Sequence, residues 1–298
     1  MEFGVVLPSF GAPARGDGVA ERLRTVAQAA DRLGYHVVWT SEHLIFPGTV
    51  TTPYPYGGKF PYDVDDPILD VATTLAWVAA STTHVKLAST VIVLPYHQPV
   101  PLAKALATVD VLSGGRLLVG VASGWLAEEF ALLGVPFAER GARFEEYLTV
   151  LRALWTEDRV TFRGRFVQLE DAAFFPKPVQ RPHPPLWIGG SSTTALRRVG
   201  RLGDGWLAVP KPSVAALEAD IAVIRRAAEE AGRDPACIGV ASSGGATSLD
   251  ALVERLPALE RIGVTIVTLP ALYWTKTIPD ALAMMADFAR RAGLERRG

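Results

Sequence analysis

The sequence predicts one α/β domain over residues 1–298, folded as a (β/α)8 barrel with an insertion before its fifth strand. Eight short apolar runs alternate with longer amphipathic segments, and no series of hairpins interrupts the alternation. Most of the runs lack polar alternation, as expected of parallel strands that are buried on both faces. The predicted strands are residues 3–7, 36–40, 85–93, 117–122, 186–188, 205–209, 238–241 and 264–269.

The helical segments between these strands follow the same order. The clearest begins at Ser213, a favourable N-cap residue, and Gly232 follows its end at a typical C-cap position. An open doubly wound sheet is the alternative architecture, but no GxGxxG motif follows the first strand. The predicted helices are residues 19–34, 68–82, 100–113, 139–156, 192–202, 213–231, 248–262 and 278–292.

Two long stretches depart from the alternation. Residues 44–67, after the second strand, are rich in Pro, Gly and Tyr, which favours a functional loop over the barrel mouth rather than a linker. Residues 158–185 lie before the fifth strand and contain a short hairpin pattern followed by a Pro-rich segment. We expect the first stretch to act as a lid and the second to be the insertion.

Composition excludes several classes of function. The 30 Lys and Arg nearly balance 31 Asp and Glu, so the net charge of -1 offers no basic excess for nucleic acid. A lone cysteine, Cys237, cannot form an internal disulfide, and no apolar stretch is long enough to span a membrane. The N-terminus lacks the features of a signal peptide, so we expect a cytoplasmic protein that acts on a small molecule.

In barrel enzymes the site lies where the strands end at their carboxyl termini. The residues at those positions are mostly small, hydroxyl-bearing or aromatic, which suits a flat aromatic ligand. The five histidines are scattered, without an HxH or HExxH motif, so no metal site is predicted. Trp125 and Trp274 fall where a substrate could touch them.

The run Gly189–Gly190–Ser191–Ser192 follows the fifth strand and opens a helix. Two glycines allow a ligand to approach the backbone closely, and the N–H groups at a helix start attract an anion such as phosphate. A tight turn with an N-cap serine explains the same residues equally well. His43, after the second strand, is a candidate proton donor or hydrogen-bonding partner for a ring system, but the residues alone favour an ordinary capping or loop histidine.

Longer segments resemble a known family. In order along the chain, they resemble the luciferase-like monooxygenases, and more narrowly the branch that uses the deazaflavin coenzyme F-420. The segments are LASTVIVLPYHQP (87–99), SGGRLLVGVASGWLAEEFALLGVPFAERGARFEEYLTVLRALWTE (113–157), PKPVQRPHPPLWIGGSS (176–192) and LRRVGRLGDGW (196–206).

This resemblance implies a TIM barrel and three features of its site. His43 would face the ring of the cofactor, and a cis peptide bond between Thr90 and Val91 would form a bulge that supports this ring. The loops after the fourth and fifth strands would hold the rest of the cofactor. The residues implied there are Ala122, Ser123 and Gly124, and Gly189, Gly190 and Ser191.

The chain departs from sugar-phosphate and pterin-reducing members of the deazaflavin branch. Where they keep polar groups after the first and fourth strands, this sequence has Ser9 and Trp125. Together with Trp274, these residues predict a more apolar substrate, such as an enone, imine or aromatic compound. Arg197, Arg198, Lys211 and Lys276 are candidates for binding the acidic tail of coenzyme F-420, although a solvated helix face explains Arg197 and Arg198 equally well.

The leading hypothesis is a coenzyme F-420-dependent oxidoreductase in which His43 assists proton transfer. Two alternatives remain open. One is an FMNH2-dependent monooxygenase, which shares the fold and the histidine and needs a flavin reductase as partner. The other is a barrel that binds a flavin without catalysis. By analogy with the family we also expect a homodimer.

Overall fold

Eight parallel strands close into a barrel in the computed structural model, which describes residues 1–55, 60, 63–211 and 213–295. The neighbours around the ring are β1–β2–β3–β5–β8–β9–β10–β11, and β11 pairs with β1 to complete it. The predicted TIM barrel is therefore confirmed. The ring strands are β1 (Glu2–Val6), β2 (Val37–Thr40), β3 (Lys86–Ser89), β5 (Leu117–Ala122), β8 (Leu186–Gly189), β9 (Gly205–Leu207), β10 (Gly239–Ser242) and β11 (Ile266–Leu269).

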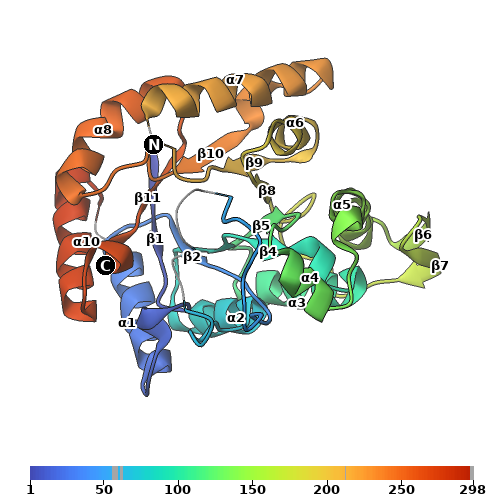
Figure 1. The fold of residues 1–298 in the computed structure, drawn as a ribbon, viewed down its shortest axis with the longest axis horizontal. Coiled ribbons are helices and arrows are strands. Elements are labelled where there is room, and N and C mark those ends of the chain that lie inside the picture. The colour runs from blue at the N-terminus through green and yellow to red at the C-terminus, as the bar shows by residue number, and fades with distance from the viewer. Residues whose placement is uncertain (56–59, 61–62, 212, 296–298) are drawn as a thin grey trace.

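Helices surround the strands on all sides in Figure 1. Side chains cap several of them as expected; for example, the Ser213 hydroxyl accepts a hydrogen bond from the Ala216 N–H. None of the helices in the described part of the chain is long and apolar enough to cross a membrane. The helices are α1 (Val19–Arg32), α2 (Val71–Ser81), α3 (Pro99–Leu112), α4 (Ala127–Leu132), α5 (Arg140–Thr156), α6 (Thr193–Leu202), α7 (Val214–Glu230), α8 (Leu249–Ile262), α9 (Ala271–Trp274) and α10 (Ile278–Ala292).

The structure corrects some predicted boundaries. The third predicted strand, 85–93, is two strands, because β3 ends at Ser89 and the short β4 (Ile92–Val93) pairs separately with β5. The strand predicted over 205–209 stops at Leu207, and the short helices α4 and α9 lie in segments expected to be loops. Apolar periodicity does not detect helices this short, because they span at most two turns.

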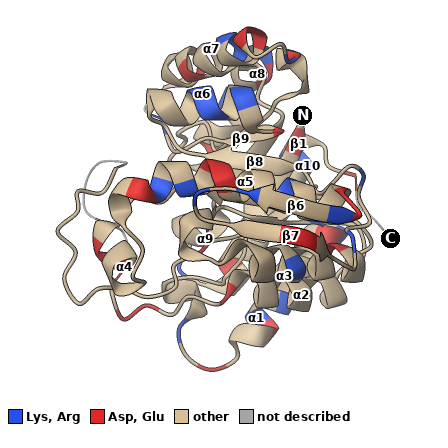
Figure 2. Cartoon of the chain, turned by 90° about the vertical axis from the view of Figure 1, so that its right-hand side faces the viewer, with Lys and Arg blue, Asp and Glu red and all other residues tan. Residues whose placement is uncertain are grey.

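The insertion before the fifth barrel strand contains the predicted hairpin. Strands β6 (Arg159–Arg163) and β7 (Gln168–Ala173) pair antiparallel and project beyond α5, away from the barrel (Figure 1). Figure 2 shows basic residues on β6 and acidic residues on β7, and an ion pair of 3.0 Å joins Arg163 to Glu170 across the hairpin. Four further short segments are 3-10 helices: Ala12–Ala14, Leu94–Tyr96, Phe137–Glu139 and Pro235–Cys237.

Two tryptophans fill the interior of the barrel. Trp39 on β2 and Trp187 on β8 are buried there with smaller apolar side chains of the other strands. Glycines make room for both rings: a Cβ on Gly4 would lie 2.5 Å from the Trp39 indole nitrogen, and one on Gly205 would lie 2.3 Å from the Trp187 ring. The interior is thus a packed core beneath the strand ends.

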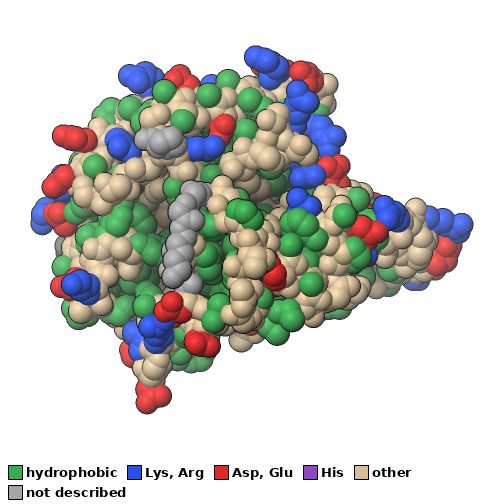
Figure 3. Space-filling model, in the orientation of Figure 1, with side chains coloured by type: hydrophobic (Ala, Val, Ile, Leu, Met, Phe, Trp, Pro, Cys, Tyr) green, Lys and Arg blue, Asp and Glu red, His purple; other side chains and the backbone are tan. Residues whose placement is uncertain are grey.

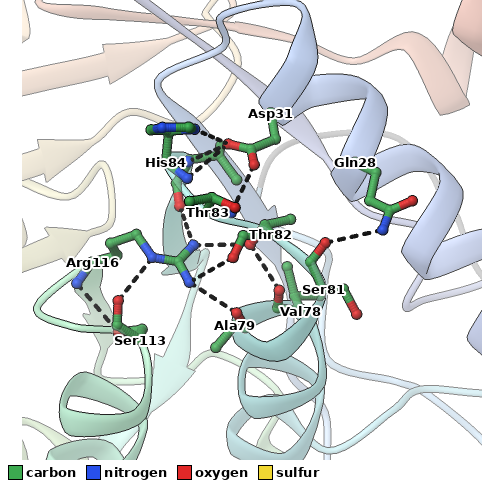
Figure 4. Close-up of polar contacts among 11 residues, drawn as sticks. Gln28, Asp31, Val78, Ala79, Ser81, Thr82, Thr83, His84, Ser113 and Arg116 are labelled. Atoms are coloured by element: carbon green, nitrogen blue, oxygen red, sulfur yellow. Dashed lines mark hydrogen bonds and ion pairs between the residues drawn. The ribbon is translucent and has the colours of Figure 1, made fainter. Parts of the chain in front are cut away.

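At the amino-terminal ends of the strands, a polar cluster ties three loops together (Figure 4). The Asp31 carboxylate accepts hydrogen bonds of 2.7–2.9 Å from the N–H groups of Thr83, His84 and Val85. Burial works against ionisation, but these hydrogen bonds outweigh it and lower the pKa of Asp31. Arg116 donates to the carbonyls of Ala79, Thr82 and Val85, so this end of the barrel is fixed.

We predict that Gly205→Ala destabilises the protein by about 1–3 kcal/mol, because the added methyl group overlaps the buried Trp187 ring. Gly48→Ala is the matched control, since a Cβ there meets nothing within 4 Å. Denaturant unfolding monitored by tryptophan fluorescence measures both variants. Equal stability of the two variants would contradict the proposed packing.

Candidate active site

A cavity of about 1050 Å³ opens at the carboxyl-terminal ends of the barrel strands. The face seen in Figure 3 is hollowed near its centre, and hydrophobic side chains gather around the hollow. With one exception, the residues that the sequence predicts for the site all line this cavity. They are His43, Thr90, Val91, Ala122, Ser123, Gly124, Trp125, Gly189, Gly190, Ser191 and Trp274.

The exception is Ser9, which we expected to contact the substrate. Its side chain is buried, with 1% of the residue exposed, and its hydroxyl lies 2.7 Å from the Thr40 hydroxyl at the end of β2. The next residue, Phe10, faces the cavity instead. The turn after β1 therefore directs Ser9 into the protein, where its hydroxyl joins two strand ends.

His43 is held by a carboxylate that the sequence did not reveal. The Nδ1 atom of its ring lies 2.6 Å from Oε2 of Glu129 on α4. The Glu129 side chain is fully buried, whereas that of His43 is 12% exposed and lines the cavity. The histidine thus turns one ring nitrogen toward a buried charge and presents its other edge to the cavity.

Glu129 also fixes the start of the long loop, residues 44–67. Its Oε1 atom accepts hydrogen bonds from the Leu44 N–H at 2.7 Å and the Ile45 N–H at 3.3 Å. The Tyr96 hydroxyl donates to Oε2 at 3.0 Å. Burial and the neighbouring carboxylate of Glu129 raise the pKa of Tyr96, so this hydroxyl keeps its proton and acts as a donor.

The neighbouring Glu128 holds the same loop further along. Its carboxylate accepts hydrogen bonds of 2.5–2.8 Å from the backbone N–H groups and hydroxyls of Thr51 and Thr52. Desolvation opposes ionisation, but these hydrogen bonds lower the pKa of Glu128 to about 2. Two adjacent residues of one short helix therefore fix the loop at two points, and the loop contributes Pro53, Tyr54, Pro55 and Phe60 to the cavity wall.

Aromatic side chains surround His43. Trp125 packs at 5.4 Å from Tyr54 and 5.5 Å from Phe60, measured between ring centroids. Phe60 in turn lies 5.8 Å from the His43 ring. These four rings form one contiguous wall, which we call the aromatic wall. It combines the long loop with the segment after β5, as expected for a pocket that binds an apolar group.

A bulge in the third strand forms another part of the wall. The peptide bond between Thr90 and Val91 is cis, as the family resemblance implies, and it separates β3 from β4. The buried Glu42 supports the bulge, since it accepts hydrogen bonds from the Val93 N–H at 2.7 Å and pairs with Nε2 of His97 at 3.0 Å. His97 is therefore part of the structure that supports the bulge.

The glycine pair after β8 shapes the cavity near the start of α6. Gly190 has a φ of 128°, and a Cβ there would lie 2.8 Å from that of Ala195. The Trp206 indole N–H donates to the Gly190 carbonyl at 2.9 Å, which fixes the orientation of this peptide. The Ser192 hydroxyl caps α6 by accepting from the Ala195 N–H at 3.2 Å. Ser191, Ser192 and Ala195 line the cavity, so the N-terminus of α6 borders it.

Of the residues that the structure describes, the cationic side chains that line the cavity are Arg140 and Lys211. Lys211 pairs with Asp220 at 2.5 Å, and its side chain is 18% exposed. Arg198 is instead buried in an ion pair of 2.9 Å with Glu145, and neither Arg197 nor Lys276 lines the cavity. Of the four basic residues considered from the sequence, only Lys211 is available to a ligand in the cavity. Within the described ranges, no three or more His, Cys, Asp or Glu side chains form a group that could hold a metal.

This arrangement fits a flat ring that carries a phosphorylated chain. The bulge at Val91 and the aromatic wall offer apolar contacts, while Gly189 and Gly190 leave a cradle that any Cβ would narrow. The N–H groups at the start of α6 and the cation of Lys211 suit an anionic group. His43 is the titratable side chain at the centre of the wall.

Comparison with known proteins identifies the family to which the chain is similar. A family model described as luciferase-like monooxygenase matches residues 1–247. An uncharacterized protein of Mycobacterium tuberculosis is 35% identical over 188 residues, which are 62% of this chain and 66% of that protein. The FMNH2-dependent dimethylsulfone monooxygenase of Pseudomonas putida is 36% identical over 167 residues, 55% of this chain and 45% of that protein. The match thus spans about two-thirds of the first relative and less than half of the second.

Solved structures share the fold over nearly the whole chain. The monooxygenase RslO1 from Streptomyces bottropensis has a TM-score of 0.79 and 25% identity, with 98% of both chains covered. The coenzyme F420-dependent tetrahydromethanopterin reductase from Methanopyrus kandleri has a TM-score of 0.75 and 17% identity, with 99% of both chains covered. At that identity the second likeness shows the fold alone.

Proposed function

The chain belongs to the luciferase-like monooxygenase family, and from that premise we propose that it is a coenzyme F-420-dependent oxidoreductase. In this proposal a hydride passes between the deazaflavin and a small, largely apolar substrate. The observation that carries the proposal is the position of His43, which a fully buried carboxylate holds against a large cavity at the strand ends. A titratable group held beside an apolar wall suits proton transfer at a reacting centre.

The residues that would hold the cofactor follow from the shape of the cavity. Val91 at the bulge would support the ring, and Gly189, Gly190 and Ser191 would lie along the phosphorylated chain. The start of α6 and Lys211 would face the anionic groups. When bound, the deazaflavin supplies the hydride chemistry, while the protein orients the reactants and excludes water.

The substrate class follows from what surrounds His43. The aromatic wall is apolar, and Glu42, the carboxylate among the cavity-lining residues, is occupied by Val93 and His97. Ser9 is buried and Trp125 stands where a polar residue would be needed to bind a sugar phosphate. We therefore infer an uncharged, unsaturated or aromatic substrate, such as an enone, imine or aromatic compound.

An FMNH2-dependent monooxygenase is the second candidate function. The observation in its favour is that the Pseudomonas putida relative, at 36% identity, and the RslO1 structure, at 25% identity, are both named as monooxygenases. FMN also carries a ring and a phosphorylated chain, so the same cavity suits it. This function would require molecular oxygen and a flavin reductase as a partner.

Cofactor titration distinguishes the two functions. We expect F-420 to bind more tightly than FMN in parallel fluorescence titrations. We also expect Gly190→Val to abolish cofactor binding, because the valine side chain would block the approach to the backbone and a φ of 128° is unfavourable for any residue with a Cβ. Gly48→Val, at an open position, is the control for folding and binding. Tight binding of FMN without binding of F-420 would establish the monooxygenase alternative instead.

The role of His43 predicts a separation of binding from turnover. His43→Ala should lower the rate of substrate-dependent cofactor oxidation or reduction by about 10²–10⁴-fold, the usual contribution of a positioned acid–base group. Its affinity for the cofactor should change much less, because the cradle after β8 stays intact. Steady-state rates and fluorescence titration measure the two effects, and an unchanged rate would reduce His43 to a structural residue.

We also propose a homodimer that forms through α2 and α3. Large apolar side chains are exposed on these neighbouring helices: Trp77 is 41% exposed, Val111 39% and Leu112 66%. A second copy of the chain would bury them. Light scattering at micromolar concentration should give twice the 32.0 kDa chain mass, and Leu112→Glu should give the chain mass. A monomer mass for the unmodified protein would refute the dimer.

A further inference from the structure

Four hydrogen-bonding groups surround the carboxylate of Glu129. Oε1 faces the N–H groups of Leu44 and Ile45, at 2.7 and 3.3 Å. Oε2 faces Nδ1 of His43 at 2.6 Å and the Tyr96 hydroxyl at 3.0 Å. The side chain is fully buried, so no bulk water competes for these positions. The directions of the other three contacts therefore decide how the contact between Glu129 and His43 is made.

Three of the four contacts have only one possible direction. A backbone N–H can only donate, so Oε1 must be an acceptor for Leu44 and Ile45. The Tyr96 hydroxyl keeps its proton, because burial and the nearby Glu129 raise its pKa, and it donates to Oε2. An ionised carboxylate has lone pairs for all four bonds. The remaining contact is complete when Nδ1 of His43 carries a proton and donates it.

The opposite nitrogen of the ring is in a different situation. The part of the chain that the structure describes offers Nε2 of His43 no hydrogen-bond partner, and the residue lines the cavity. The other groups in contact with the ring are aromatic and uncharged: Phe10, Phe46, Phe60 and Trp125. Glu42, the neighbour in sequence, is occupied by Val93 and His97. Among the residues that the structure describes, Glu129 is thus the charged group in contact with the His43 ring.

We propose that Glu129 is a positioning residue that holds His43 as the neutral tautomer with its proton on Nδ1, so that Nε2 faces the cavity as a proton acceptor. The catalytic consequence rests on the proposed function, in which His43 exchanges a proton with the substrate. In the direction of substrate oxidation, Nε2 accepts the proton of the O–H or N–H group of the reduced substrate, and the adjacent carbon gives up its hydride. The carboxylate then stabilises the positive ring that results. In the direction of reduction, the protonated ring returns this proton to the oxygen or nitrogen.

The tautomer is directly measurable without cofactor or substrate. In a long-range ¹⁵N–¹H correlation spectrum of the ¹⁵N-labelled protein at neutral pH, we expect His43 to show a protonated Nδ1 and an unprotonated Nε2. The His43→Ala variant assigns its signals among those of the five histidines. A neutral ring with its proton on Nε2 would overturn the proposal, and so would a ring protonated on both nitrogens.

Glu129→Gln gives a sharper test, because it should reverse the tautomer. The two backbone N–H groups at Leu44 and Ile45 require an acceptor, so the amide oxygen must take the place of Oε1. The amide NH2 then replaces Oε2 and donates to Nδ1 of His43, which moves the ring proton to Nε2. We expect the ¹⁵N signals of the two ring nitrogens to exchange character, and an unchanged tautomer in the folded variant would refute the role of Glu129.

Glu128→Gln is the matched control, because the neighbouring carboxylate bonds to Thr51 and Thr52 and makes no contact with His43. It should leave the His43 signals in place; a changed tautomer would assign the effect to helix α4 as a whole and refute the proposal. If Glu129→Gln does not fold, the spectrum of the unmodified protein decides alone. If the protein shows the expected tautomer but binds neither F-420 nor FMN, the proposed function is refuted and the inference about Glu129 stands.

Discussion

The requirement that a closed barrel be filled from within underlies the rest of this structure. Trp39 and Trp187 are the largest side chains in the interior, and glycines on neighbouring strands leave room for their rings. Each tryptophan lies a few residues before a segment of the site: Trp39 precedes His43, and Trp187 precedes Gly189 and Gly190. Tight packing below the strand ends therefore holds the backbone from which the cavity is built. The polar cluster around Asp31 and Arg116 fixes the opposite end in the same way.

The barrel could be predicted from sequence because its signal is local and repeated. Each buried parallel strand is a short apolar run, and eight of them alternate with amphipathic helical segments along the chain. The residues directly after the strands could be placed at one face for the same reason, and they do line one cavity. The family resemblance added the cis bond at Thr90–Val91, which no residue pattern alone indicates.

What the sequence could not supply depends on contacts between distant segments. Glu129 lies 86 positions from His43, and in sequence it is one of two acidic residues at the start of a short helix, where both would be assigned to solvent. Only the fold shows that one of the two is fully buried. The expected contact between Ser9 and the substrate could not be judged from sequence for a related reason. The position of Ser9 after a strand is visible in the sequence, but the direction of its side chain depends on how the turn packs against Thr40.

Together, the two acidic residues of α4 link the position of the long loop to the orientation of His43. Glu129 binds both the ring of His43 and the backbone at the start of the long loop, and Glu128 binds the loop further along. The loop in turn contributes Tyr54 and Phe60 to the aromatic wall. Loop position, the shape of the apolar wall and the orientation of the histidine therefore depend on one two-turn helix. Because a buried carboxylate is costly unless donors surround it, the loop cannot leave Glu129 without removing both donors of Oε1. Glu129 would also lose a hydrogen bond if the His43 ring turned away, so the burial of this carboxylate keeps both the loop and His43 in place.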